Sequence, residues 1–153
     1  MREILFKAKR IDNGEWVEGF LFKMQMEGGY TWCIGEEPLT ANDYSEIIGC
    51  GRTWFFINHH TLCQYTGLTD KNGNKIWEND IVKCYAVDIC DREYEFVSDI
   101  FWDDCMWMVH EKKYSDGMLC HFDMSKNWLS HIPEIEAIGN IFDNPELINR
   151  TEF

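Results

Sequence analysis

Short clusters of Gly, Asn and Asp interrupt the apolar runs of this chain about every 8–15 residues. Such clusters form turns because their residues tolerate a positive φ or hydrogen-bond their own backbone. The apolar runs between them show weak helical periodicity and are rich in aromatic residues, which pack well on a pleated sheet. Aromatic residues make up 15% of the chain. We therefore expect a mostly β protein, built as a barrel or a sandwich.

The clearest turn signal is Asn13-Gly14, which stands between two apolar-rich runs. Asn-Gly favours a two-residue type I′ turn, because both central residues need a positive φ. The sequence therefore predicts a hairpin with strands at about 3–11 and 16–24. Its register would place Lys9 opposite Glu18, and the carboxylates of Asp12 and Glu15 opposite each other.

The rest of the chain predicts strands separated by turns, with one short helix. Gly28-Gly29 and the segment 70–73 are further turn signals. Asn144 can cap a helix, Pro145 suits its first turn and Glu146 favours the positive end of its dipole, which predicts a helix at about 145–150. The expected strands lie at about 30–34, 46–48, 54–57, 81–89, 94–102, 106–111, 118–123 and 135–142.

The charge balance argues against nucleic acid as a partner. The chain has 14 Lys and Arg against 27 Asp and Glu, a formal net charge of −13. Nucleic-acid affinity depends mainly on Lys and Arg that displace counterions from phosphates, so we expect no nucleic-acid binding. No apolar run approaches the roughly 18 residues of a membrane helix, and the first residues have no signal-peptide core. We expect a cytoplasmic protein without a membrane partner, in which seven cysteines at irregular spacing stay reduced.

Metal binding and catalysis find little support in the spacing of Cys, His and acidic residues. The tightest sets are His59-His60 with Cys63 and Cys120-His121, and Cys84, Cys90 and Cys105 stand elsewhere. Neither set has the paired spacing of a structural zinc site. Adjacent residues of a strand point to opposite faces, so we expect His59 and His60 to diverge. We therefore predict no catalytic residue, no metal ligand and no cofactor.

Aromatic and acidic residues gather in the second half of the chain and form the best candidate for a partner-binding site. An exposed aromatic cluster marks an interaction surface, whereas a buried one is the core of a small barrel. The neighbouring carboxylates can be plain surface charge or can hold Mg²⁺ or Ca²⁺. The candidate residues are Trp102, Trp107, Trp128, Asp103 and Asp104.

Three segments of the chain carry a recognisable set of motifs. The segments are FKAKR (6–10) with NGEWVEG (13–19), QYTGLTDKNG (64–73) with IWENDIV (76–82), and IGNIFDNPEL (138–147). Together they resemble the YopX family of phage and prophage proteins, in which such segments occur in the same order, at both ends and in the middle of the chain. The family usually has Gly before the Asp-Ile-Val step of the second segment, where this chain has Asn79.

The resemblance implies one YopX-like unit over 1–153, encoded by a phage or prophage and present in the bacterial cytoplasm. An N-terminal β-hairpin lobe (1–60) would pack with an SH3-like β-barrel (61–143), followed by a short C-terminal helix or tail (144–153). Asn79 would keep a left-handed turn, since Asn shares Gly's positive φ most often. The resemblance supplies no catalytic residue, and the motif residues are expected to be structural: Gly14, Trp16, Gly67, Asp70, Gly73, Asp80, Gly139, Asn140, Asn144 and Pro145.

Three functional hypotheses follow. The first is a non-enzymatic interaction module that binds another protein or a second copy of itself. The second is an acidic mimic of nucleic acid that inhibits a DNA-binding host enzyme through its negative surface. The third is a metal-dependent hydrolase that uses the acidic cluster. The absence of a catalytic motif favours the first hypothesis.

Overall fold

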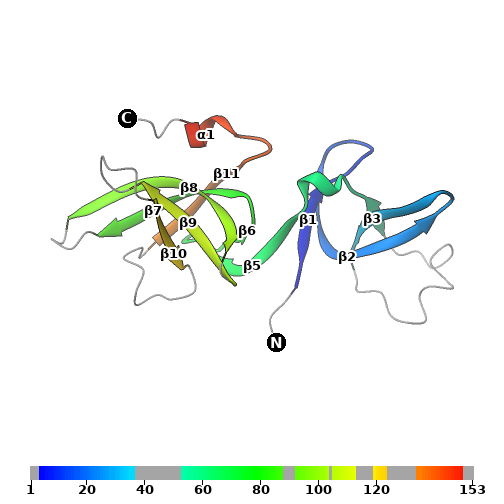
Figure 1. The fold of residues 1–153 in the computed structure, drawn as a ribbon, viewed down its shortest axis with the longest axis horizontal. Helices are drawn as coiled ribbons and strands as arrows, with labels where there is room; N and C mark the ends of the chain where they lie inside the picture. The colour runs from blue at the N-terminus through cyan, green and yellow to red at the C-terminus, as the bar shows by residue number, and fades with distance from the viewer. Residues whose placement is uncertain are drawn as a thin grey trace. The chain divides into compact units, whose positions relative to one another are not determined.

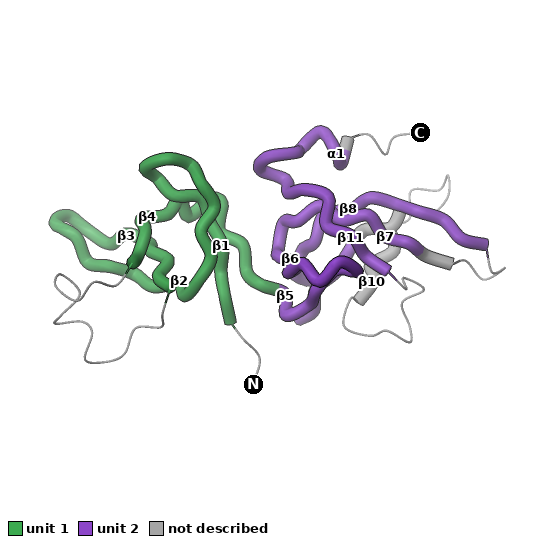
Figure 2. Tube along the Cα trace, turned by 180° about the vertical axis from the view of Figure 1, so that it is seen from behind, with its two compact units in different colours: residues 1–65 green, residues 66–153 purple. Residues whose placement is uncertain are grey.

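The computed structural model describes residues 4–36, 53–87, 92–103, 105–112, 119–123 and 134–149. Strands dominate these ranges, which confirms the prediction of a mostly β protein. The chain divides into two compact units, residues 1–65 and 66–153 (Figures 1 and 2). None of the described helices has the length and apolar composition needed to cross a bilayer.

The first unit is built on antiparallel strands in the order β4-β3-β2-β1-β5. Strand β5 continues into the second unit, where it is followed by its sheet neighbour β6. A 3₁₀ helix, η2 (His59–Thr61), precedes β5. The strands are β1 (Phe6–Lys9), β2 (Trp16–Met26), β3 (Gly29–Gly35), β4 (Trp54–Phe56) and β5 (Cys63–Thr69).

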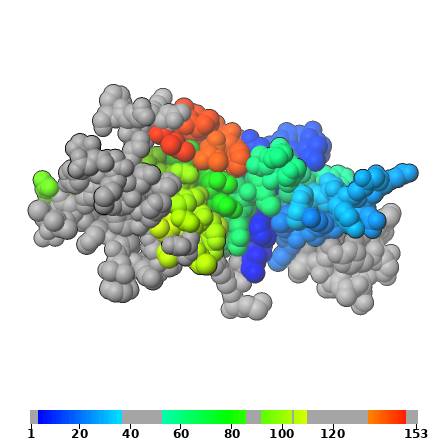
Figure 3. All heavy atoms as spheres, in the orientation of Figure 1, coloured from blue at the N-terminus to red at the C-terminus, as the bar shows by residue number. Residues whose placement is uncertain are grey.

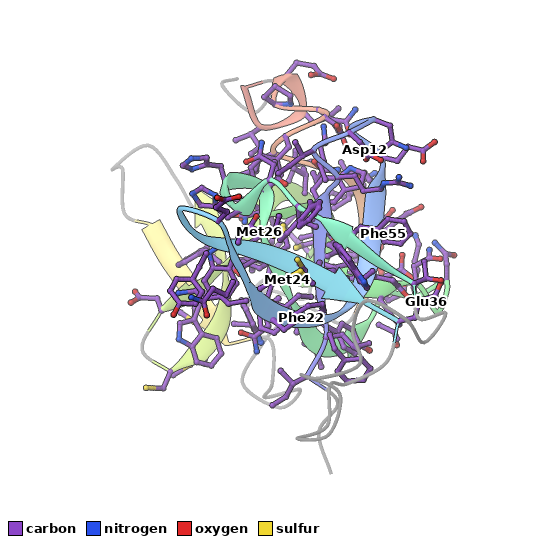
Figure 4. The ribbon with its side chains drawn as sticks, turned by 90° about the vertical axis from the view of Figure 1, so that its right-hand side faces the viewer. Asp12, Phe22, Met24, Met26, Glu36 and Phe55 are labelled. Atoms are coloured by element: carbon purple, nitrogen blue, oxygen red, sulfur yellow. The ribbon has the colours of Figure 1, made fainter. Side chains whose placement is uncertain are left out.

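Alternation along β2 and β3 decides which side chains enter the core of the first unit. Ala8, Ile34 and Ile57 form its buried centre, and Leu21 and Trp32 pack against it. The side chains of Phe22, Met24 and Met26 follow the other face of β2 (Figure 4), because successive residues of a strand point to opposite faces.

The β1–β2 hairpin forms, but the predicted register is wrong. Lys9 pairs with Trp16 and Lys7 with Glu18, so four residues rather than two span the turn between Arg10 and Glu15. Gly14 alone in this turn has a positive φ (75°), and its N–H donates to the Arg10 carbonyl at 3.1 Å. The register differs by two residues, so every side chain keeps the face that the sequence predicts.

The second unit contains a five-stranded antiparallel sheet in the order β10-β9-β8-β7-β11. Ile76, Val82, Ile100, Trp107 and Val109 are buried in its core. Within the described ranges both sheets are open, so the SH3-like barrel stays a prediction. The elements are β6 (Lys75–Trp77), β7 (Asp80–Val87), β8 (Glu93–Asp103), β9 (Met106–Lys112), β10 (Leu119–Asp123), β11 (Glu134–Asn140) and α1 (Glu146–Asn149).

The turn before β7 has the conformation predicted from the residue that replaces glycine. Asn79 has φ 64°, inside the left-handed region. Its N–H donates to the Ile100 carbonyl at 2.8 Å, and its carbonyl accepts from Ile141 N at 3.0 Å. Asp80 Oδ2 closes the turn by accepting from Trp77 N at 2.8 Å. Asn79 therefore has the left-handed conformation that the resemblance led us to expect.

Candidate functional site

The end of the β8–β9 hairpin carries the aromatic and acidic residues that the sequence singles out. The register places Trp102 directly opposite Trp107 and Asp103 opposite Met106. The turn between them includes Cys105, whose φ of 63° is left-handed. Figure 3 shows both strands, in yellow-green, at the surface of the second unit. Trp128 and Asp104 lie outside the described residues.

The two tryptophans of this pair have different environments. Trp107 is 6% exposed and belongs to the core of the second unit, whereas Trp102 is 48% exposed. Their rings meet edge to face, with centroids 4.7 Å apart and planes at 69°. Such pairs contribute about 0.5–1.5 kcal/mol beyond the area they bury. Trp107 therefore fixes a half-exposed aromatic ring to a rigid hairpin.

Trp107 also carries an unusual polar atom. Its Nε1–H is buried and has no hydrogen-bond acceptor within the described part of the chain. An orphaned buried donor costs about 1–3 kcal/mol, and buried indole N–H groups usually find a partner. The packing of the Trp107 ring in the core must offset this cost.

The charged side chains of strand β8 are all carboxylates, of which Asp103 lies at this end of the hairpin. Four carboxylates stand at odd positions of the strand, on the face opposite to Trp102, and no Lys or Arg occurs between Glu93 and Asp103. Asp103 is exposed. One of the four, Glu95, forms an ion pair with Lys83 at 2.6 Å. The carboxylates are Glu93, Glu95, Asp99 and Asp103.

The metal candidates do not converge in the part of the chain that the structure describes, where no three Cys, His, Asp or Glu side chains could hold an ion. The strand expected at His59 and His60 is wrong. Asn58 Oδ1 accepts from His60 N at 3.1 Å and caps the 3₁₀ helix η2 instead. The two rings therefore lie beside each other, 4.0 Å apart, rather than on opposite faces.

A charged cluster on the second unit has no counterpart in the sequence reasoning. Lys71 Nζ lies 2.7 Å from Glu136 Oε2 and donates to Tyr85 Oη at 3.1 Å. These contacts raise the pKa of Lys71, through the hydrogen bond to Glu136 first, and lower the pKa of Glu136. Lys71 is therefore held as a cation and is a poor nucleophile or base. Tyr85 and Glu136 come together because β7 pairs with β11. The sequence could have indicated this cluster only if the register of that pairing had been known.

The Asp70 turn, in the second family-like segment, is hydrogen-bonded to strand β11. Asp70 is 6% exposed, and its Oδ1 accepts from Asn72 N at 2.9 Å and Asn74 N at 2.8 Å. Its Oδ2 accepts from Asn74 Nδ2 at 3.1 Å and from Ala137 N, in strand β11 just before the third segment, at 3.3 Å. Burial raises the pKa of this carboxyl, but the hydrogen bonds outweigh it and the pKa lies below its usual range. Asp70 therefore has a structural arrangement, as does Gly73 with its φ of 84°.

The residues of the C-terminal motif contact one another. A Cβ on Gly139 would lie 2.6 Å from Asn144 Oδ1, so any other residue here would force the Asn144 side chain to move. Asn140 Oδ1 accepts from Phe142 N and Asp143 N at 3.0 Å each. The Asn144 carbonyl accepts from Leu147 N at 3.0 Å at the start of α1, which Pro145 precedes.

The remaining motif residues lie at turns and strand surfaces. Gly67 has φ 84° inside β5, next to Thr66, whose Oγ1 bonds Leu68 N at 3.1 Å. Trp16 lies under the ammonium groups of Lys7 and Lys9, 5.1 and 5.5 Å from the ring centroid. These positions shape the backbone and the sheet surface.

Comparisons with known proteins give a family and a distant structural likeness. Protein EF1440 from Enterococcus faecalis is 18% identical, with a TM-score of 0.43, over 97% of this chain and 99% of that one. No curated protein matches the chain. The family model described as YopX protein matches residues 5–149, which include all three family-like segments. The chain therefore belongs to the YopX family.

Proposed function

We propose that this protein is a non-enzymatic interaction module that binds another protein through the end of the β8–β9 hairpin. Trp102 is the centre of the surface, and Asp103 lies beside it. The proposal includes a role inside a bacterial cell, on behalf of a phage or prophage.

One observation carries the proposal: a half-exposed tryptophan is held against a buried tryptophan of the core. Binding energy at protein interfaces concentrates in a few residues, with Trp among the most frequent. A pre-positioned ring also loses little conformational entropy on binding. Trp102 has both properties before any partner arrives.

The charge of the surrounding strand favours a protein over a nucleic acid. Phosphates are repelled by a strand that carries four carboxylates and no cation of its own. A protein partner with a basic surface would be attracted by the same field and would associate faster.

The test is a comparison of three forms of the protein. The parent, Trp102→Ala and Tyr30→Ala are immobilised and used to capture proteins from a bacterial lysate. Tyr30 is 72% exposed on the first unit and is the matched control. We expect one protein to be retained by the parent and by Tyr30→Ala, and to bind Trp102→Ala at least tenfold more weakly. Capture that is equal on all three forms would overturn the proposal.

A further inference from the structure

The tryptophans of this protein differ in what covers their rings. Trp16 lies under Lys7 and Lys9, Trp32 under Lys23 with the ammonium 4.3 Å from its centroid, and Trp77 under Lys75 at 5.8 Å. A cation over an indole face is attracted by the negative charge of the π-system. The chain thus places its own lysines over three of its tryptophans.

Among the described residues, no cation covers the ring of Trp102. Among the described residues its only ring contact is the edge-to-face contact with Trp107, and no lysine or arginine stands over its face. It is also the most exposed of the described tryptophans, at 48%. The only charged side chains in its own strand are carboxylates.

We infer that Trp102 is a binding site for an arginine side chain, which the protein partner supplies; this inference rests on the proposed function. The guanidinium lies flat on the exposed face of the indole, where cation–π attraction and stacking act together. The carboxylate of Asp103, the next residue of the strand, adds long-range attraction for the positive charge. Arginine fits better than lysine because its planar group stacks and is more weakly hydrated.

The inference is tested with the pentapeptide acetyl-Gly-Gly-Arg-Gly-Gly-amide and its counterpart with citrulline, the neutral isostere of arginine. The indole N–H signals of the full-length ¹⁵N-labelled protein are followed during each titration. Spectra of Trp102→Phe and Trp107→Phe assign the two signals of the pair. Trp32, whose ring Lys23 already covers, is the internal control.

We expect the arginine peptide to shift the Trp102 signal in a saturable way and to leave the Trp32 signal in place. The citrulline peptide should bind about fivefold more weakly, the ratio expected from loss of a cation–π contact at an exposed site. Trp102→Leu should abolish the saturable response of the neighbouring Trp107 signal. Equal affinity for the two peptides, or an unchanged Trp102 signal, would overturn the inference.

The two proposals fail in different ways. Protein capture that depends on Trp102, together with no arginine preference, removes the arginine site and leaves the interaction module. An arginine preference at Trp102, together with capture that ignores Trp102, keeps the arginine site and removes the proposed function.

Discussion

The two units hold their turns by different means. In the first unit the β1–β2 turn is exposed and is closed by its own side chains: Arg10 pairs with Asp12, and Asn13 Nδ2 donates to Glu15 at 2.7 Å. In the second unit, Asp70 binds the backbone of Ala137 in a strand far along the sequence. A turn of the first kind shapes only its own hairpin, whereas one of the second kind holds separate strands together.

The largest effect that this comparison predicts is at Asp70. Asp70→Ala removes the acceptor of three backbone N–H groups and one side-chain amide, and should lower the free energy of unfolding by about 2–4 kcal/mol. Amide hydrogen exchange should accelerate in β7 and β11. Asp12→Ala is the matched control in the exposed turn and should leave exchange in β1 and β2 unchanged. If Asp70→Ala and Asp12→Ala lowered the free energy of unfolding equally, the two turns would not differ in the way described above.

The same carboxylate should make stability depend on acidic pH. The pKa of Asp70 is lower in the folded protein than in the unfolded chain, where it is about 3.9. Its contribution is therefore complete above about pH 4 and is lost as the pH falls through the folded value. We expect the denaturant midpoint of Asp70→Asn to fall less steeply below pH 4 than that of the parent. Parallel curves would show that Asp70 does not titrate in this way.

The next effect is at Asn79, which is tied to β8 and to Ile141. Asn79→Val should lower the free energy of unfolding by about 1–3 kcal/mol, because a β-branched residue resists a positive φ. Asn79→Gly should be neutral or slightly stabilising. Urea unfolding measures both. If both variants unfold with the parent, the left-handed turn before β7 has no energetic weight.

The smallest effect is expected at Gly14 in the exposed turn. A Cβ there meets no atom within 4 Å, so Gly14→Ala has only the strain of φ 75° and should lower stability by about 1 kcal/mol. Exchange should change in β1 and β2 and not in β7. If Gly14→Ala lost more stability than Asn79→Val, the exposed turn of the first unit would contribute more to stability than the turn before β7, contrary to the comparison.

Strands with an apolar run could be predicted within about two residues, as β7, β8 and β9 show. The strands around the Asp70 turn were missed. Strand β5 contains Gly67, a residue type that is depleted in strands, and β6 has only three residues. Their stability comes from partners elsewhere in the chain, which no local pattern reports. The left-handed conformation of Asn79 was predicted from the family resemblance rather than from a local pattern. The hairpin register was missed because it depends on the number of loop residues.

The candidate site was predictable only as a group of residues. Its aromatic members stand out in the sequence, but the sequence left both the core and the surface as their place. Pairing across β8 and β9 sends Trp107 into the core and leaves Trp102 half exposed at the hairpin end. That difference arises from the position of each ring relative to the edge of the packed core, and so from the tertiary structure.

The fully buried thiol of Cys33 in β3 can report how often the core of the first unit opens. Burial raises the pKa of Cys33 to about 11, so at pH 8 about one molecule in a thousand carries the reactive thiolate while the core stays closed. Alkylation must then wait for the strands around it to separate. In a variant whose other cysteines are replaced by serine, the rate of thiol labelling would report how often the strands around Cys33 separate. It would therefore describe openings of the first unit alone. Mass spectrometry could measure the alkylated fraction over time in dilute samples and in cells.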